Sequence, residues 1–306
     1  MANDRLDHIG KLRAVFAEVS AEPLTSSVTL DTFKSNTFPM ACMATFAKCI
    51  EYNVAANHDS SLAISHAIMS AGLRGICEDL IALKYLLRFD HQIANDIVLA
   101  TSVLEIHTGI ERQRDFIYLN NPTQLFVGSS HSMSDIRSNV KASKEELKGL
   151  WNKTGATNRP SIKAMAEYIK LDSLYSYLYF AASNHVHHNI RTLFITAWGS
   201  KDGPTGFSST NLSDYYHAFN SFYGALLYCG IVWSGLPIDV LGNHQDHAAK
   251  VEAVLRQVGW WPETITRDEM NIKRINLVEI ITNMNMREKE PPAGLSIFDE
   301  LKIPVS

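Results

Sequence analysis

Apolar residues recur every three or four positions along most of this chain, and almost no segment alternates apolar and polar residues as a half-buried strand does. Hydrophobic residues make up 46% of the 306 positions and charged residues 20%, a balance typical of folded globular proteins. The sequence therefore predicts an all-α fold, a multi-helix bundle with a small helical C-terminal appendage. We place the bundle at residues 1–245 and the appendage with its tail at residues 246–306.

Capping residues, glycines and prolines delimit the predicted helices. Two capping-box patterns, which begin at Ser143 and Thr266, are expected to open helices. Segments 124–138 and 199–209 are rich in serine and glycine and predict loops, and the tail from residue 288 shows little periodicity. The helices are expected at residues 6–19, 32–56, 61–88, 93–118, 143–151, 160–169, 173–198, 213–236, 244–258 and 266–286.

Charge and hydropathy limit the partners of this chain. A formal net charge of −4 provides no basic field for coating double-stranded DNA. The N-terminal segment carries charges throughout and lacks the apolar region of a secretory signal. Residues 217–238 carry no formal charge over the length of a membrane-spanning helix, but asparagine, serine, tyrosine and glycine interrupt them. We interpret this segment as a core helix and expect neither a membrane nor double-stranded DNA as a partner.

The cysteines indicate a reducing compartment. None belongs to a C-x-x-C pair, and no histidine follows at zinc-finger spacing. Most of them stand in apolar helical segments, where a free cysteine behaves as a small hydrophobic residue. We therefore expect reduced thiols in a cytoplasmic protein. The cysteines are Cys42, Cys49, Cys77 and Cys229.

One predicted helix places two opposite charges in apolar surroundings. Arg74 and Glu78 share a face with Ile81 and Tyr85, and the opposite face carries leucines such as Leu73. A helix that is apolar on both faces is usually buried on both. The charged pair is then a buried structural network, part of a functional site, or a surface i,i+4 ion pair of low energy. The sequence leaves these three interpretations open.

A second predicted helix carries a continuous polar stripe. Tyr175, Tyr179, Ser183 and His187 stand at successive i,i+4 positions, so all four side chains lie on one face. Arg74, Glu78, Tyr179, Ser183 and His187 are therefore the candidate site residues.

Two histidine pairs have the i,i+3 spacing of helical metal ligands. His185 and His188 have no acidic residue within one turn, and His244 and His247 flank Asp246 at a helix start that the pattern predicts to be exposed. For both pairs, a solvated or core position is the favoured interpretation. We therefore assign no metal-binding residue and no cofactor.

Common catalytic motifs are missing from the sequence. It contains no GxSxG elbow, no Walker A loop and no GxGxxG after a strand. The R-x(4–6)-H motif of many helical toxin ribonucleases is also missing. A nuclease of this sequence would have to combine an arginine and a histidine from separate helices.

The two polar helices resemble those of a bacterial all-helical family, domain of unknown function 5677. Its members pair an LR-x-x-x-E helix with a Y-x-x-x-S-x-x-V-H helix, and the resemblance covers roughly residues 60–235. The corresponding residues here are Arg74, Glu78, Trp151, Tyr179, Ser183, Val186 and His187. The family is similar to the helical HEPN group, whose relatives occur in phage defence and toxin systems. The resemblance thus implies a bacterial stress-response context.

Two functions from different classes are consistent with these residues. The favoured one is a helical sensor or interaction subunit of an anti-phage or toxin-type response. In this interpretation the polar residues fix the helix packing, and the surface binds a protein partner or a second copy of the chain. Residues 217–238 and the pair Trp260 and Trp261 are the expected contact elements.

The alternative function is a metal-independent, HEPN-like ribonuclease or nucleotide-processing enzyme, with RNA or a nucleotide as its ligand. His187 would act as the general base, and Arg74 would hold the phosphate through paired hydrogen bonds. Glu78 would orient Arg74, and Tyr179 would supply a further hydrogen bond to the phosphate.

Overall fold

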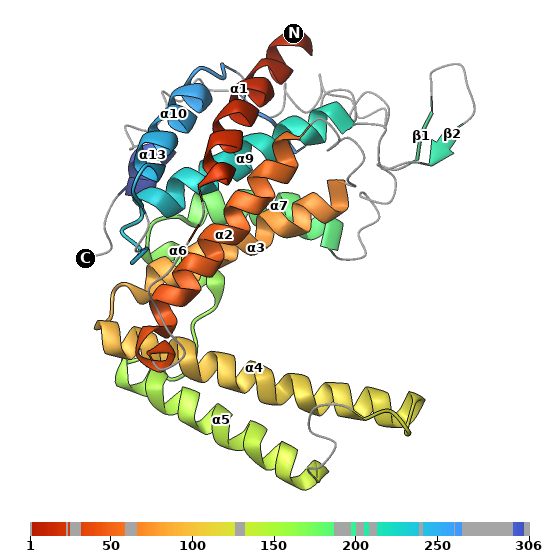
Figure 1. Ribbon diagram of the computed structural model, residues 1–306, viewed down its shortest axis with the longest axis vertical. Coiled ribbons are helices and arrows are strands. Elements are labelled where there is room, and N and C mark those ends of the chain that lie inside the picture. Colours follow the sequence, from red (N-terminus) through yellow and green to blue (C-terminus); the bar gives the residue numbers. More distant parts are fainter. Residues whose placement is uncertain are drawn as a thin grey trace, which may run out of the picture.

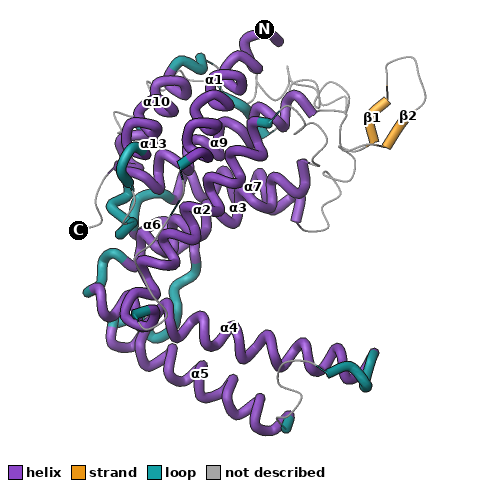
Figure 2. Tube along the Cα trace, in the orientation of Figure 1, coloured by secondary structure: helices purple, strands orange, loops and turns teal. Residues whose placement is uncertain are grey.

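Helices dominate the fold (Figure 2), which confirms the predicted all-α bundle. The computed structural model describes residues 2–22, 24, 32–58, 66–125, 132–186, 197–199, 205–207, 213–238, 241–259, 261–264 and 296–302. The elements are α1 (Ala2–Ala21), η1 (Phe33–Asn36), α2 (Thr37–Asn57), α3 (His66–Leu86), α4 (His91–Asn120), α5 (Met133–Lys153), α6 (Ile162–Tyr168), α7 (Asp172–Val186), β1 (Ala197–Gly199), β2 (Thr205–Phe207), α9 (Ser213–Trp233), α10 (His244–Arg256) and α13 (Ile297–Lys302).

Helix α9 is the central helix of the body, and α1, α2, α3, α10 and α13 all pack against it (Figure 1). Its residues from Ala218 to Val232 are almost entirely buried. The prediction of an uncharged core helix is therefore confirmed. Within the described residues we find no helix with both the length and the hydropathy of a membrane span.

The polar residues on α9 are explained by its contact with α2. The Tyr52 hydroxyl donates to Asn220 Oδ1 over 3.2 Å, and the Ser221 hydroxyl donates to Asn57 Oδ1 over 2.5 Å. A Cβ atom added at Gly224 would lie only 2.6 Å from Tyr52 Cε1, so glycine is needed for this close approach. Asparagine, serine and glycine thus fit this helix to a neighbouring helix rather than to lipid.

Helices α4 and α5 form an antiparallel hairpin that projects from the body, and we call this hairpin the arm (Figure 1). Its base is fixed by Asn95, whose Oδ1 accepts from the Phe38 amide over 3.0 Å and whose Nδ2 donates to the Lys34 carbonyl over 2.6 Å. Further out, His107 Nδ1 lies 2.8 Å from Ser143 Oγ and links the two helices. The arm therefore has polar links to the body and between its own helices.

The start of α5 differs from the prediction. Ser132 caps the helix and forms a capping box with Asp135, so α5 begins at Met133 and residues 133–138 are helical rather than loop. Ser143 is buried in the middle of the helix, and its hydroxyl lies against His107. The prediction that a helix begins at Ser143 was therefore wrong, because the Ser143 side chain contacts His107 of α4 instead of capping a helix.

One further helix limit was predicted wrongly, and one helix of the tail was not predicted. The helix expected to run to residue 198 cannot do so, because residues 197–199 form β1, which pairs antiparallel with β2. The tail contains one further short helix, α13, although its sequence shows little periodicity. The predicted helix at 266–286 lies outside the described residues.

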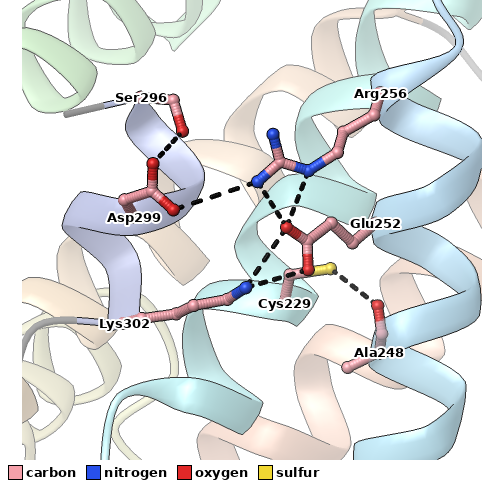
Figure 3. A network of polar contacts seen from close by, with 7 residues as sticks. All are labelled: Cys229, Ala248, Glu252, Arg256, Ser296, Asp299 and Lys302. Atoms are coloured by element: carbon pink, nitrogen blue, oxygen red, sulfur yellow. Dashed lines mark hydrogen bonds and ion pairs between the residues drawn. The ribbon is translucent and has the colours of Figure 1, made fainter.

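Helices α10 and α13 contact each other through a charged network centred on Glu252 (Figure 3). The Glu252 carboxylate accepts from Arg256 over 2.6 and 2.8 Å and from Lys302 over 3.1 and 3.2 Å. Beneath this network, Phe298 and Leu301 are buried in the same core as α9. The C-terminal helices therefore share the hydrophobic core of the bundle.

The cysteine side chains are free thiols, as the sequence predicts, and all of them are buried. Burial raises the pKa of Cys42 and of Cys77 to about 12, so both thiols keep their protons near neutral pH. A protonated, buried thiol is a poor nucleophile, which gives these side chains a packing role.

Candidate functional site

Helices α3 and α7 pack closely against each other and bring together most of the predicted site residues. On α3, Arg74 Nε donates to Glu78 Oε1 over 2.7 Å. On α7, the rings of Tyr175 and Tyr179 are 5.3 Å apart between centroids. The Arg74 guanidinium carbon lies 4.6 Å from the Tyr179 ring centroid, a cation–π contact. We call these four residues the α3–α7 polar site.

The α3–α7 polar site stands at the edge of the core. The Arg74 and Glu78 side chains are 21% and 27% exposed. Ile81 and Leu83, two residues apart and therefore on nearly opposite faces of the same helix, are both buried, which confirms that α3 is covered on both sides. The charged pair is therefore neither sealed in the interior nor free on the surface, and water or a ligand can reach it from one side.

The charge of Glu78 sets the electrostatics of this site. Burial alone would lower the pKa of the Arg74 guanidinium, but the hydrogen bond and the charge of Glu78 outweigh it and raise that pKa. Burial raises the pKa of Tyr175, and the negative charge of Glu78 raises it further. Arg74 is thus a permanent cation, and Tyr175 a neutral hydroxyl, at physiological pH.

Ser183 lies one turn beyond Tyr179 on α7, as predicted. Its hydroxyl oxygen is buried and finds no hydrogen-bond partner among the described residues. A buried hydroxyl without a partner is unfavourable, and such groups often mark a place where water or a ligand binds. His187 lies outside the described residues, so its position relative to Arg74 stays a prediction.

The contacts of Arg74 in the α3–α7 polar site fix the orientation of its guanidinium. A carboxylate holds the guanidinium at Nε and an aromatic ring supports its face, which is the arrangement that orients arginine for phosphate or carboxylate groups. Tyr179 contributes its ring face to Arg74. The cation–π contact with Arg74 uses only the ring of Tyr179. The role of the Tyr179 hydroxyl as a hydrogen-bond donor to phosphate stays a prediction.

A second polar cluster joins the end of α1 to the start of α10. His244 and His247 were expected at an exposed helix start, but both are buried, because Phe46 and Tyr228 pack near His244 and α1 packs against α10. Glu22, the residue after α1, faces both imidazoles. Sequence reasoning found the histidine spacing but not this carboxylate, because Glu22 comes from a distant part of the chain.

The expected contact elements also need correction. Helix α9 is buried in the body and therefore presents little surface to a partner. Trp261 is partly exposed, but its ring packs 4.9 Å from that of Phe222 and 6.1 Å from that of Phe298. Trp260 lies outside the described residues. Among the described residues, several of the most exposed apolar side chains lie instead near or just beyond the end of α4, and they are Phe116, Tyr118, Leu119 and Leu125.

These features define a helical bundle with a partly exposed polar site between two helices and a projecting helical hairpin. The chain belongs to the Family of unknown function (DUF5677), whose sequence profile matches residues 40–203. The match begins within α2, earlier than the resemblance indicated, and ends at residue 203 rather than near 235. It contains the arm and every predicted site residue. Comparisons with curated proteins and with solved structures find no match to the chain.

Proposed function

We propose that this protein is a helical interaction subunit of a bacterial anti-phage or toxin-type stress response, located in the cytoplasm. It binds a protein partner or a second copy of its own chain through the end of the arm. The stress-response context follows from the resemblance to HEPN-like helical proteins. The observation that supports binding is the high exposure of four apolar side chains within one short stretch of the arm end, Phe116, Tyr118, Leu119 and Leu125.

The arm has the features of a binding element. Leu119 is 80% exposed and Leu125 is 87% exposed, although the core of the body buries residues of the same kind. Single exposed leucines are common, but a group of large apolar side chains on a projecting element typically marks a protein contact. Asn95 links the base of the arm to α2, and His107 links the two helices of the arm to each other.

Site-specific photo-crosslinking in cells of the source organism tests this function. A photoreactive benzoylphenylalanine replaces Leu119 at the arm end, and the control chain carries it at the exposed Lys141 on α5. We expect discrete adducts from position 119 and none of the same size from position 141. Identical adducts, or no adducts, at both positions would contradict binding through the arm end. An adduct of twice the 34.2 kDa chain mass identifies a second copy, and any other discrete mass identifies a different protein.

A second candidate function is supported by the α3–α7 polar site. As a metal-independent, HEPN-like ribonuclease or nucleotide-processing enzyme, the protein would hold a phosphate at Arg74, with Glu78 orienting the guanidinium. His187 would remove the proton of a ribose 2′-hydroxyl, the 2′-oxygen would attack phosphorus, and the departing 5′-oxygen would take a proton. The 2.7 Å contact between Arg74 and Glu78 is the observation in favour.

A further inference from the structure

The cluster between α1 and α10 places three metal-ligand side chains at one point. His244 Nε2 lies 3.9 Å from Glu22 Oε2, and His247 Nε2 lies 4.0 Å from Glu22 Oε1. One ligand atom from each of the three residues can be chosen so that all lie within 4.8 Å of one another. These separations are longer than a hydrogen bond, which spans about 2.7–3.2 Å between nitrogen and oxygen. Glu22 and the two imidazoles therefore make no direct hydrogen bond to one another.

We propose that Glu22, His244 and His247 bind a divalent transition-metal ion such as Zn²⁺, which connects α1 to α10. Two imidazole nitrogens and one carboxylate oxygen are a common protein ligand set for zinc. Ligand atoms about 2.0–2.1 Å from one tetrahedral zinc ion lie about 3.4 Å from each other. The histidine–glutamate separations of 3.9 and 4.0 Å are slightly longer than this value. Small side-chain rotations that move each ligand atom by about an ångström or less would bring them to it.

The surroundings hold two of the three ligands, His244 and Glu22, in the orientation that metal binding needs. The Tyr228 hydroxyl lies 3.2 Å from His244 Nδ1, which turns the Nε2 atom of that ring toward Glu22. Asn243 Nδ2 donates to Glu22 Oε1 over 3.1 Å. Such secondary contacts fix the tautomer of a ligating histidine and the direction of a ligating carboxylate.

A fourth position is open to water or to Glu18. Glu18 Oε2 lies 3.6 Å from His247 Nε2, but the same oxygen accepts from Lys250 over 2.7 Å. Because Lys250 holds Glu18, we expect a water molecule to complete the shell. Solvent can reach the cluster, since the Glu22 side chain is 32% exposed although both imidazoles are buried. A metal ion can therefore enter from the Glu22 side.

The consequence of this site is a metal-dependent attachment of the N-terminal helix. Glu22 follows α1 directly, and both histidines lie on the first turn of α10. An ion that binds all three residues favours the folded state, in which these residues are together, over the unfolded chain, in which they are apart. Zinc should therefore raise the melting temperature of the full chain.

Metal titration of the full-length chain, after treatment with a chelator, tests the proposal. We expect one Zn²⁺ per chain by calorimetry and, with Co²⁺ as the probe, the intense visible absorption of a tetrahedral site. Glu22→Gln and His247→Gln should each weaken Zn²⁺ binding at least ~10-fold, because each removes a ligand. His91→Gln, at an exposed histidine on α4, is the matched control and should bind as the parent does.

Two results would overturn the metal site. One is the absence of saturable Zn²⁺ binding by the parent chain. The other is binding that Glu22→Gln and His247→Gln leave unchanged. If either variant fails to fold, the melting temperature of the parent chain with and without Zn²⁺ tests the site instead. A rise with Zn²⁺ that a chelator reverses supports the site, and an unchanged melting temperature contradicts it.

Discussion

The guanidinium carbon of Arg74 lies 4.6 Å from the centre of the Tyr179 ring, so a cation on α3 is supported by an aromatic face on α7. A partly exposed contact of this kind contributes about 0.5–1 kcal/mol. Its geometry also turns the guanidinium so that Nε meets Glu78 on the same helix. One interhelical contact therefore both stabilises the packing of α3 on α7 and orients the charge of the candidate site.

Substitutions at Tyr179 separate its ring from its hydroxyl. Tyr179→Phe keeps the ring, so we expect the free energy of unfolding to stay within about 0.5 kcal/mol of the parent value. Tyr179→Leu removes the ring and should cost about 0.5–1 kcal/mol. Denaturant unfolding measures both. A larger loss for phenylalanine than for leucine would show that the hydroxyl, rather than the ring face, supports Arg74.

Glu78→Ala tests how strongly the environment couples the charged pair. Removal of one partner of a fully buried ion pair costs about 3–5 kcal/mol. An exposed ion pair contributes less than about 1 kcal/mol. Because Arg74 and Glu78 are partly exposed, we expect a loss of about 1–2 kcal/mol in the free energy of unfolding.

The exposed i,i+4 pair of Lys163 and Glu167, 3.8 Å apart, supplies the control for this measurement. Glu167→Ala should cost less than about 0.5 kcal/mol. If Glu78→Ala and Glu167→Ala lower the free energy of unfolding equally, the surroundings of Arg74 and Glu78 do not strengthen that ion pair. A loss of about 3 kcal/mol or more at Glu78 would place that pair in a sealed interior instead.

His187→Gln separates the enzyme from the interaction subunit. Glutamine keeps hydrogen bonding and approximate size but cannot transfer a proton as imidazole does. If the protein is a ribonuclease, cleavage of a labelled RNA by the purified chain should fall by about 10²–10⁴-fold with an unchanged melting temperature. His185→Gln and His188→Gln serve as neighbouring controls and should leave cleavage intact. No cleavage by the parent chain, with a lower melting temperature for His187→Gln, would assign the residue to packing.

Lys84 predicts a pH dependence of stability. Its buried ammonium donates to the Leu301 carbonyl over 2.9 Å, and burial lowers the pKa of Lys84 to about 8. Below pH 8 the lysine is charged in both the folded and the unfolded chain. Between pH 8 and its ordinary pKa near 10.4, the unfolded chain binds a proton that the folded chain has released. The lysine contribution to the free energy of unfolding therefore rises with pH over this window, by up to about 3 kcal/mol.

The buried thiols oppose this trend, because raised thiol pKa values remove stability as pH rises above about 9. The comparison must therefore be with Lys84→Met, which keeps the thiols and the packing volume. Urea unfolding at several values between pH 7 and pH 9.5 should show the parent chain gaining stability relative to this variant. A constant difference between the two chains across this range would mean that the Lys84 pKa is not lowered.

Much of the helical layout was readable in the sequence, because helical periodicity is a local property of the backbone. The core position of α9 was indicated by the lack of charged residues at 217–238, and the i,i+4 spacing of Arg74 and Glu78 follows from 3.6 residues per turn. The contact between these two side chains needs only that α3 is a helix. It was therefore predictable without knowing how α3 packs.

The tertiary structure decided whatever depends on residues far apart in the chain. The sequence pattern at Ser143 is that of a helix cap, but packing of α5 on α4 gives this serine a partner in His107 and leaves the cap to Ser132. Likewise, the spacing of His244 and His247 was visible, whereas Glu22 reaches them only because α1 lies against α10. Local periodicity fixes which face a residue occupies, but the packing of one helix on another fixes which partner that face meets.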